Sequence, residues 1–188
     1  MSIETPEQLA GLRRAGAVVA EVLRTLQAAV KQDVTTGELD ALAAETMAAR
    51  GARSGPILTY GYPGSVCLSI DDEVVHGIPG DRVLRDGELI TLDVALELDG
   101  YHADAATTVA VGEADGTARR LVAAARAALQ AGIRAARPGA TLRTSAPPCS
   151  ASRRHAASGS SPSCTATASA GPCTKTRRST TGPIRRAP

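Results

Sequence analysis

The stretch ELITLDVALELDGYHADAATTVAV, Glu88–Val111, contains the pattern that decides the fold. Its two halves, Leu89–Glu97 and Tyr101–Val111, are rich in β-forming residues and flank the dipeptide Asp99-Gly100. This dipeptide favours a two-residue type I′ turn between antiparallel strands. The stretch therefore predicts a β-hairpin in which Leu98 pairs with Tyr101.

The predicted hairpin brings two acidic residues to one face. In this register Asp93 lies opposite Ala106, and Asp104 lies two residues away on the same side of the sheet. Diagonal neighbours of this kind are about 7–8 Å apart, a distance at which two carboxylates can share cations. Asp93 also lies within an apolar run, where a carboxylate is costly unless a metal or a partner compensates it. Aspartates near strand ends are more often solvated, so spacing alone leaves a metal role open.

Four sequence motifs surround these aspartates in a fixed order. They are Tyr62-Pro63-Gly64-Ser65-Val66-Cys67, Glu73-Val74-Val75-His76-Gly77-Ile78-Pro79, Asp86-Gly87 with Asp93, and Asp99-Gly100-Tyr101-His102 with Asp104. Together they resemble the type I methionine aminopeptidases, and the resemblance extends over Thr5–Arg143. It implies an α+β fold, the N-terminal half of the pita-bread (creatinase/aminopeptidase) fold.

The resemblance also implies a reaction and a site. The family removes the initiator methionine from new polypeptides, using divalent metal ions (Co, Mn, Fe or Zn) held by two aspartates, one histidine and two glutamates. Two such ions are bound per site. Asp93 and Asp104 match the aspartate ligands, and His76 matches a catalytic histidine that contacts the substrate near the scissile amide. Tyr62 and Cys67 match the methionine side-chain pocket. The other histidine and both glutamates match nothing in this chain.

Without the resemblance, these side chains have simpler interpretations. A histidine at a strand end, where we expect His76, is more often structural or exposed than catalytic. A cysteine such as Cys67 is more often a small buried apolar residue. His102 alternates with Asp104 and is expected to face the same side, but we assign it no role.

Helices are predicted on both sides of the hairpin. Thr5 and Pro6 begin one that carries an apolar stripe from Leu9 to Leu26, and Thr35–Glu38 forms a capping box for a second that ends at Gly51. Gly55–Ser69 is predicted as strand and loop, and Thr117–Ala136 as a helix.

Charge divides the chain into two parts. Residues 144–188 contain seven Lys or Arg and no Asp or Glu, whereas the remaining residues carry 14 basic and 19 acidic side chains. We therefore predict an incomplete catalytic domain at 1–143 and a basic, Ser/Pro/Ala-rich, disordered tail at 144–188. We find no signal peptide, no membrane-spanning run and no CxxC spacing. A cytoplasmic monomer is expected, with nascent polypeptide N-termini as its partners, near the ribosome, and with no membrane or nucleic-acid partner.

A shifted reading frame explains more of the tail than disorder does. If each new codon joins the last base of one codon to the first two of the next, GC-rich codons allow Cys164–Arg177 to read LHGHGIGRALHEDP. That string resembles the family's next segments, including its metal-binding histidine, whose place Thr167 takes here. We therefore expect a truncated, frameshifted chain that binds metal weakly and hydrolyses little or nothing.

Two other classes of function stay open. A proline-directed relative, such as a prolidase or aminopeptidase P, would keep both aspartates, although the VVHGIP and GYPGSVC motifs argue against it. A non-enzymatic binding protein with a basic nucleic-acid-binding tail would show salt-dependent retention on RNA or DNA that vanishes when residues 144–188 are deleted.

Overall fold

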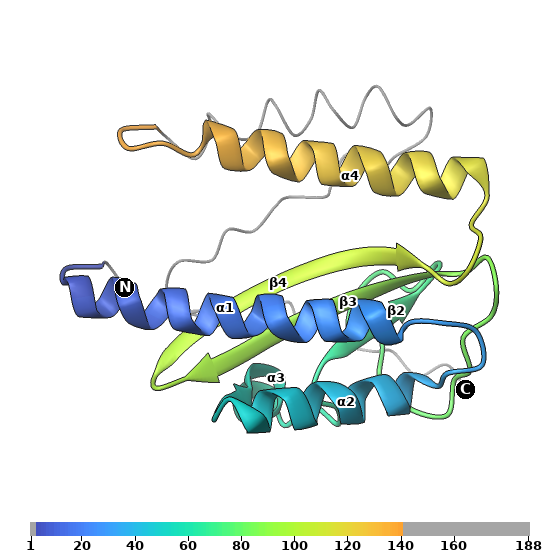
Figure 1. The fold of residues 1–188 in the computed structure, drawn as a ribbon, viewed down its shortest axis with the longest axis horizontal. Helices are drawn as coiled ribbons and strands as arrows, with labels where there is room; N and C mark the ends of the chain where they lie inside the picture. The colour runs from blue at the N-terminus through green and yellow to red at the C-terminus, as the bar shows by residue number, and fades with distance from the viewer. Residues whose placement is uncertain (1–2, 141–188) are drawn as a thin grey trace, which may run out of the picture.

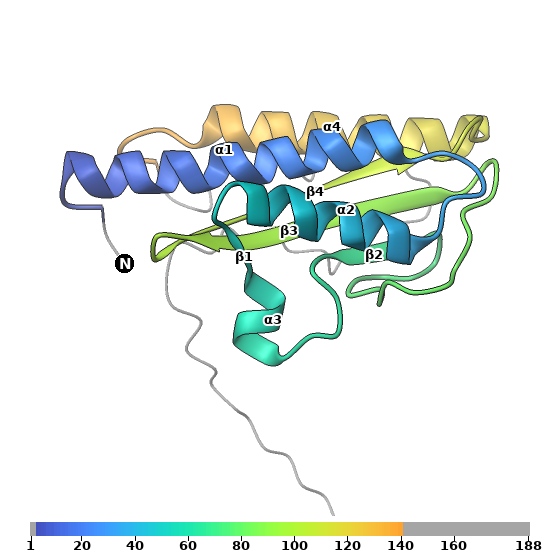
Figure 2. The same cartoon turned by 60° about the horizontal axis from the view of Figure 1, so that its bottom comes forward.

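A four-stranded antiparallel sheet with helices packed along one face forms the centre of the molecule (Figures 1 and 2). The structure, a computed structural model, describes residues 3–140. The predicted tail, residues 144–188, lies outside this range. Helix α1 lies along the two long strands, and α2 packs beside α1.

The first two helices begin where the sequence predicts, and the second ends at Ala49, two residues before the predicted Gly51. Helix α1, Pro6–Ala29, is capped by Thr5, whose hydroxyl accepts from the backbone of Gln8. Helix α2, Thr36–Ala49, has the predicted capping box, in which Thr35 and Glu38 bond each other's backbone amides. The two predicted helices and their N-terminal caps are therefore confirmed. The apolar stripes of the two helices cover one face of the sheet.

The longest strand, β3 (Leu89–Leu98), is the centre of the sheet. Strands β1 (Arg53–Ser54) and β2 (Cys67–Ile70) pair with successive parts of one edge of β3, and β4 (Tyr101–Ala110) pairs with its other edge. Alternate residues of β3 enter the core, namely Ile90, Leu92, Val94 and Leu96, each at most 1% exposed. The residues between them, including Asp93, therefore face the opposite side of the sheet.

The hairpin has the predicted register. Leu98 pairs with Tyr101 and Asp93 pairs with Ala106. Asp99 and Gly100 have φ angles of 53° and 82°. Positive φ at both turn residues is the requirement of a type I′ turn, so that prediction is confirmed.

One acidic side chain holds this turn to the neighbouring strand. Glu97 is 7% exposed; it accepts from Arg53 Nε at 2.8 Å and from the backbone amide of Gly100. These two bonds, of which the one from Arg53 has the larger effect, hold the pKa of Glu97 below its ordinary value. The carboxylate therefore stabilises the fold above the unfolded-state pKa, and that contribution is lost as pH falls through the lower folded-state pKa.

We expect Glu97→Gln to lower the free energy of unfolding at pH 7 by on the order of 1 kcal/mol. The difference in unfolding free energy between the variant and the parent chain should disappear as pH falls below about 4.3, the ordinary glutamate pKa. Urea midpoints between pH 7 and pH 3 measure this, with Glu45→Gln, an exposed residue of α2, as the control. A gap that stays constant over the whole range would contradict the assigned role of Glu97.

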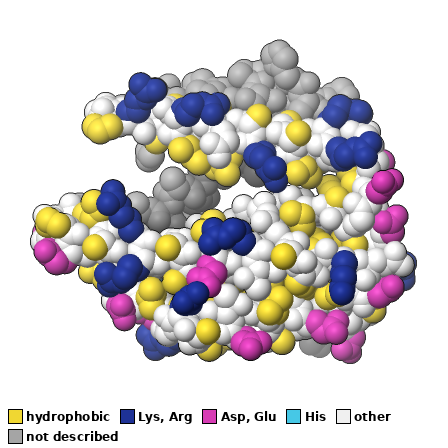
Figure 3. Space-filling view, viewed as in Figure 1, with side chains coloured by type: hydrophobic (Ala, Val, Ile, Leu, Met, Phe, Trp, Pro, Cys, Tyr) yellow, Lys and Arg dark blue, Asp and Glu magenta, His cyan; other side chains and the backbone are white. Residues whose placement is uncertain are grey.

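Two segments differ from the sequence prediction. Gly55–Ser69 was predicted as strand and loop, but Gly55–Tyr60 forms a short helix, α3, capped by the Ser54 side chain. Helix α4, Gly116–Ala135, begins one residue before its predicted start because Asp115 caps it. Figure 3 shows a hollow between α4 and the body of the molecule. No helix within residues 3–140 is long and apolar enough to cross a membrane.

Candidate active site

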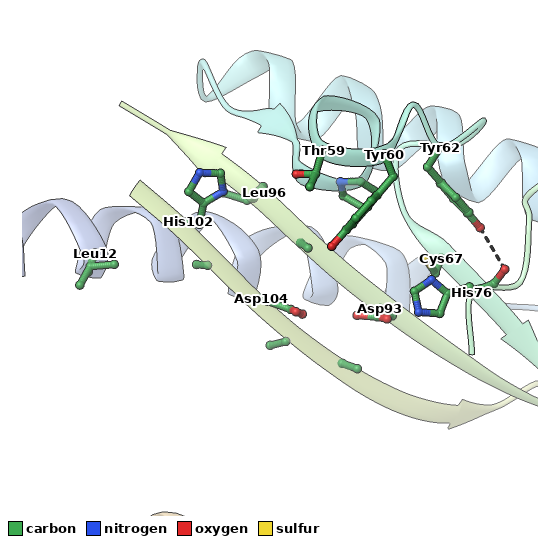
Figure 4. A pocket seen from close by; sticks show the side chains of 16 residues that line it. Leu12, Thr59, Tyr60, Tyr62, Cys67, His76, Asp93, Leu96, His102 and Asp104 are labelled. Carbon is green, nitrogen blue, oxygen red and sulfur yellow. Dashed lines mark hydrogen bonds between the residues drawn. The ribbon is translucent and has the colours of Figure 1, made fainter. Parts of the chain in front are cut away.

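Two aspartates from neighbouring strands converge on the sheet face that the first two helices leave uncovered. Asp93 on β3 pairs with Ala106, and Asp104 on β4 pairs with Ala95, so the two acids are diagonal neighbours. Both side chains line one pocket (Figure 4). The predicted placement of the pair is therefore confirmed, while its role as a ligand pair stays a prediction.

The two carboxyl groups are diagonal neighbours in one pocket, and two charged carboxylates placed there together are costly unless a proton or a cation compensates them. Burial, followed by the charge of Asp104, raises the pKa of Asp93, while the charge of His76 lowers it. Burial also raises the pKa of Asp104, offset in part by its interaction with Asp93. A paired site of this kind favours either a shared proton or a cation between the oxygens.

The donor chemistry fits a divalent cation, but the donor count does not complete a site. Carboxylate oxygens are ligands for hard and borderline divalent ions. Within the described part of the chain, however, no group of three or more His, Cys, Asp or Glu side chains converges as a metal site would require. The described residues can therefore contribute two carboxylate ligands to a metal site but cannot complete one.

Tyr62 and Cys67 form the wall of the pocket beside Asp93. Cys67 is the first residue of β2 and pairs directly with Asp93 across the sheet. Burial raises the pKa of the Cys67 thiol, and the charges of Asp93 and Asp104 raise it further. Burial and, after it, the interaction with Cys67 likewise raise the pKa of Tyr62. Both groups are thus neutral near pH 7, which suits contact with an uncharged side chain.

His76 reaches the pocket from a loop and not from a strand end as predicted. Strand β2 ends at Ile70, and His76 has a φ of 60°, a left-handed conformation. The next residue, Gly77, is pressed against β2: a Cβ there would lie 2.1 Å from the carbonyl oxygen of Leu68. This close packing fixes the turn that directs the His76 imidazole towards Asp93 (Figure 4).

The pocket has a volume of about 1070 Å³ and includes residues that sequence reasoning missed. Helix α3 contributes Pro56, Thr59 and Tyr60 to its lining, and His102 faces it from β4, as its alternation with Asp104 predicted. The signal for α3 was present, because Ser54 can cap a helix and Pro56 suits its first turn. The glycines that follow, Gly61 and Gly64, favoured the prediction of a loop instead of a helix.

Comparison with known proteins matches residues 10–147 to the model of metallopeptidase family M24. The chain belongs to metallopeptidase family M24. Membership of this family implies a divalent metal cofactor, in agreement with the paired aspartates. The match covers the whole sheet, both pocket loops and α4.

Among M24 proteins, the chain is similar to curated methionine aminopeptidases. It is 38% identical to the methionine aminopeptidase of Staphylococcus epidermidis over 143 residues, which are 76% of this chain and 57% of that enzyme. It is 37% identical to methionine aminopeptidase 1 of Bacillus subtilis over 139 residues, 74% of this chain and 56% of that enzyme. The chain thus spans little more than half the length of the curated relatives it matches.

Solved structures place the fold in the same M24 group. The crystal structure of methionine aminopeptidase from Rickettsia prowazekii matches with a TM-score of 0.77 and 32% identity, over 82% of this chain and 63% of that one. Prolidase from Pyrococcus furiosus matches with a TM-score of 0.69 at 17% identity, over 81% of this chain and 44% of that one, which shows a shared fold alone. The predicted pita-bread fold is therefore confirmed for the described residues.

Proposed function

We propose that this chain carries the N-terminal part of a methionine aminopeptidase site. The observation that supports this most strongly is the convergence of Asp93, Asp104, His76, Tyr62 and Cys67 on one pocket. These residues come from three strands and two loops, yet they are the ones that the methionine aminopeptidase motifs single out. The proposed substrates are nascent polypeptides with an N-terminal methionine, in the cytoplasm.

Each side chain has a proposed task. Asp93 and Asp104 would hold a divalent metal, two ions per site by the family pattern, which activates water and polarises the carbonyl when bound. His76, beside Asp93, would donate a hydrogen bond to the substrate at the scissile amide. Tyr62 and Cys67, both neutral, would contact the methionine side chain, whose polarizable thioether favours such surroundings.

This 188-residue polypeptide supplies too few metal ligands for turnover. The family pattern calls for five, and the described residues provide two carboxylates. Residues 144–188 contain no Asp or Glu, so they cannot provide the two glutamates. We propose that a frameshift near the codons for Arg143 and Thr144 produced this tail, and that the chain as written binds metal weakly.

A chimeric enzyme tests the proposed function apart from the tail. The segment of the Staphylococcus epidermidis enzyme that this chain matches over 143 residues is replaced with the matching residues of this chain. We expect the chimera to release methionine from a Met-Ala-Ser peptide and to leave Ala-Pro dipeptides intact. Asp93→Ala should reduce that release by at least about a hundredfold, since the remaining ligands would then hold the metal poorly.

Two results of this experiment would contradict the proposal. Cleavage of Ala-Pro in preference to Met-Ala-Ser would assign the site to a proline-directed peptidase. Undiminished methionine release by the Asp93→Ala chimera would remove Asp93 from the ligand set. The exposed Asp72→Asn variant is the matched control, because it changes an acid outside the pocket.

A further inference from the structure

The first half of α2 contacts both loops that carry pocket side chains. At its start, the Thr36 hydroxyl donates to the carbonyl of Gly80 at 3.1 Å and accepts from the Gly80 amide at 2.9 Å. The amide of Gly37 donates to the same carbonyl at 2.8 Å. These bonds fix the loop that contains His76 to the N-terminal end of α2.

One turn later, Asp40 holds the second loop. Its Oδ1 atom accepts from the backbone amides of Ser65 at 2.7 Å and Val66 at 2.9 Å. Both distances are typical of charge-assisted hydrogen bonds, which are about twice as strong as neutral ones. Val66 directly precedes Cys67, so the carboxylate fixes the backbone immediately before a pocket residue.

The junction around Asp40 has little spare room. A Cβ added to Gly64 would lie 2.8 Å from Cδ of Pro79 and 3.3 Å from Oδ1 of Asp40. Pro79 belongs to the loop of His76, whereas Gly64 belongs to the loop of Tyr62. The helix and both loops therefore meet at this one carboxylate.

A second contact ties the two loops together inside the pocket. The Tyr62 hydroxyl donates to the carbonyl of Gly77 at 2.7 Å, next to His76. The amide of Gly77 donates to the Ser69 hydroxyl at 3.1 Å. A shift of the backbone at residues 64–66 would therefore move Tyr62 and Cys67 relative to His76.

We propose that Asp40 is a positioning residue of the pocket, whose carboxylate fixes the Ser65 and Val66 amides and thereby places Tyr62 and Cys67 opposite His76. This inference deepens the proposed function, because those three side chains are the ones assigned to substrate contact. Asp40 itself is absent from the residues that line the pocket. Its effect on the substrate is therefore indirect, through the position of the loop.

Thiol labelling of the full 188-residue chain tests this proposal without any turnover, so a failure to release methionine does not affect it. The native protein is treated with iodoacetamide, and mass spectrometry follows the peptide that contains Cys67, which is 4% exposed. We expect Asp40→Ala to increase the labelling rate by at least about tenfold, because two charge-assisted bonds are lost. Asp40→Asn retains an acceptor oxygen and should stay within about threefold of the parent.

Two controls separate positioning from general loss of stability. Glu45→Ala removes an exposed acid from the same helix and should leave the rate unchanged. Thr5→Ala removes the cap of α1, a helix that carries neither loop, and should lower the melting temperature without selective labelling of Cys67. A parent-like Cys67 labelling rate in Asp40→Ala overturns the proposal. If Thr5→Ala melts at the same temperature as Asp40→Ala and its Cys67 is labelled equally fast, the proposal is also overturned.

A second variant covers the case in which Asp40→Ala does not fold. Gly64→Ala places a methyl group against Pro79 and the Asp40 carboxylate, so it disturbs the same junction from the other side. We expect the same selective increase in Cys67 labelling, together with faster amide exchange at Ser65 and Val66. Parent-like labelling and exchange in this variant overturn the proposal.

Discussion

The purified 188-residue chain should release no measurable methionine from a Met-Ala-Ser peptide at any concentration of added Co²⁺, Mn²⁺, Fe²⁺ or Zn²⁺. In the proposed site, Asp93 and Asp104 supply two of the five ligands of the family pattern, and residues 144–188 contain no acidic side chain that could complete the set. A metal that is poorly held can neither orient a water molecule nor lower its pKa.

Restoring the reading frame should have the opposite effect. Insertion of one base near the codons for Arg143 and Thr144 would replace the tail with the segments that resemble the rest of the family. We expect methionine release to appear in that product and to be lost again in Asp93→Ala. Turnover by the 188-residue chain itself, abolished by Asp93→Ala, would contradict this account, because it would show that the present residues complete the site.

Replacing Asp93 with asparagine should stabilise the metal-free chain by about 0.5–2 kcal/mol, the range common for single stabilising substitutions. Burial and the neighbouring Asp104 raise the pKa of Asp93, so the folded state disfavours the charged carboxylate. A raised folded-state pKa means that stability falls as pH increases from the unfolded-state pKa, about 3.9, to the higher folded-state value.

Urea unfolding in EDTA measures this effect. At pH 7 Asp93→Asn should unfold at a higher urea concentration than the parent chain, and the difference should shrink at pH values below about 3.9, where the parent aspartate is protonated in both states. Asp72→Asn, an exposed acid near β2, should have no such effect. If Asp93→Asn is less stable than the parent chain at pH 7, this prediction is contradicted. The result would show that a partner stabilises the charged Asp93 carboxylate more than burial and Asp104 destabilise it.

The hairpin and its acids were predictable because their determinants are local. Asp99-Gly100 fixes the turn, the turn fixes the register, and the register alone places Asp93 and Asp104 on one face. The capping boxes at Thr5 and Thr35 are equally local, since each involves residues three positions apart.

The remaining site geometry depends on contacts between distant segments. His76 was predicted at a strand end, but its turn is set by the packing of Gly77 against β2 and by the Tyr62 hydroxyl. The bond from Arg53 to Glu97 spans 44 positions in the sequence, and that from Ser65 to Asp40 spans 25. No periodicity or motif encodes these partners, so the link between α2 and the pocket could not be predicted from the sequence.

The most direct test of the account is to locate where a divalent ion binds in the folded chain. Mn²⁺ is added to the ¹⁵N-labelled protein, and paramagnetic broadening of backbone amide signals is measured, a method that detects even weak binding. We predict that broadening appears first at Asp93, Asp104 and their cross-strand partners Ala95 and Ala106, and that the Asp93→Asn/Asp104→Asn variant loses it. Broadening that is centred elsewhere, or that survives in the double variant, would contradict the assignment of these two aspartates as metal ligands.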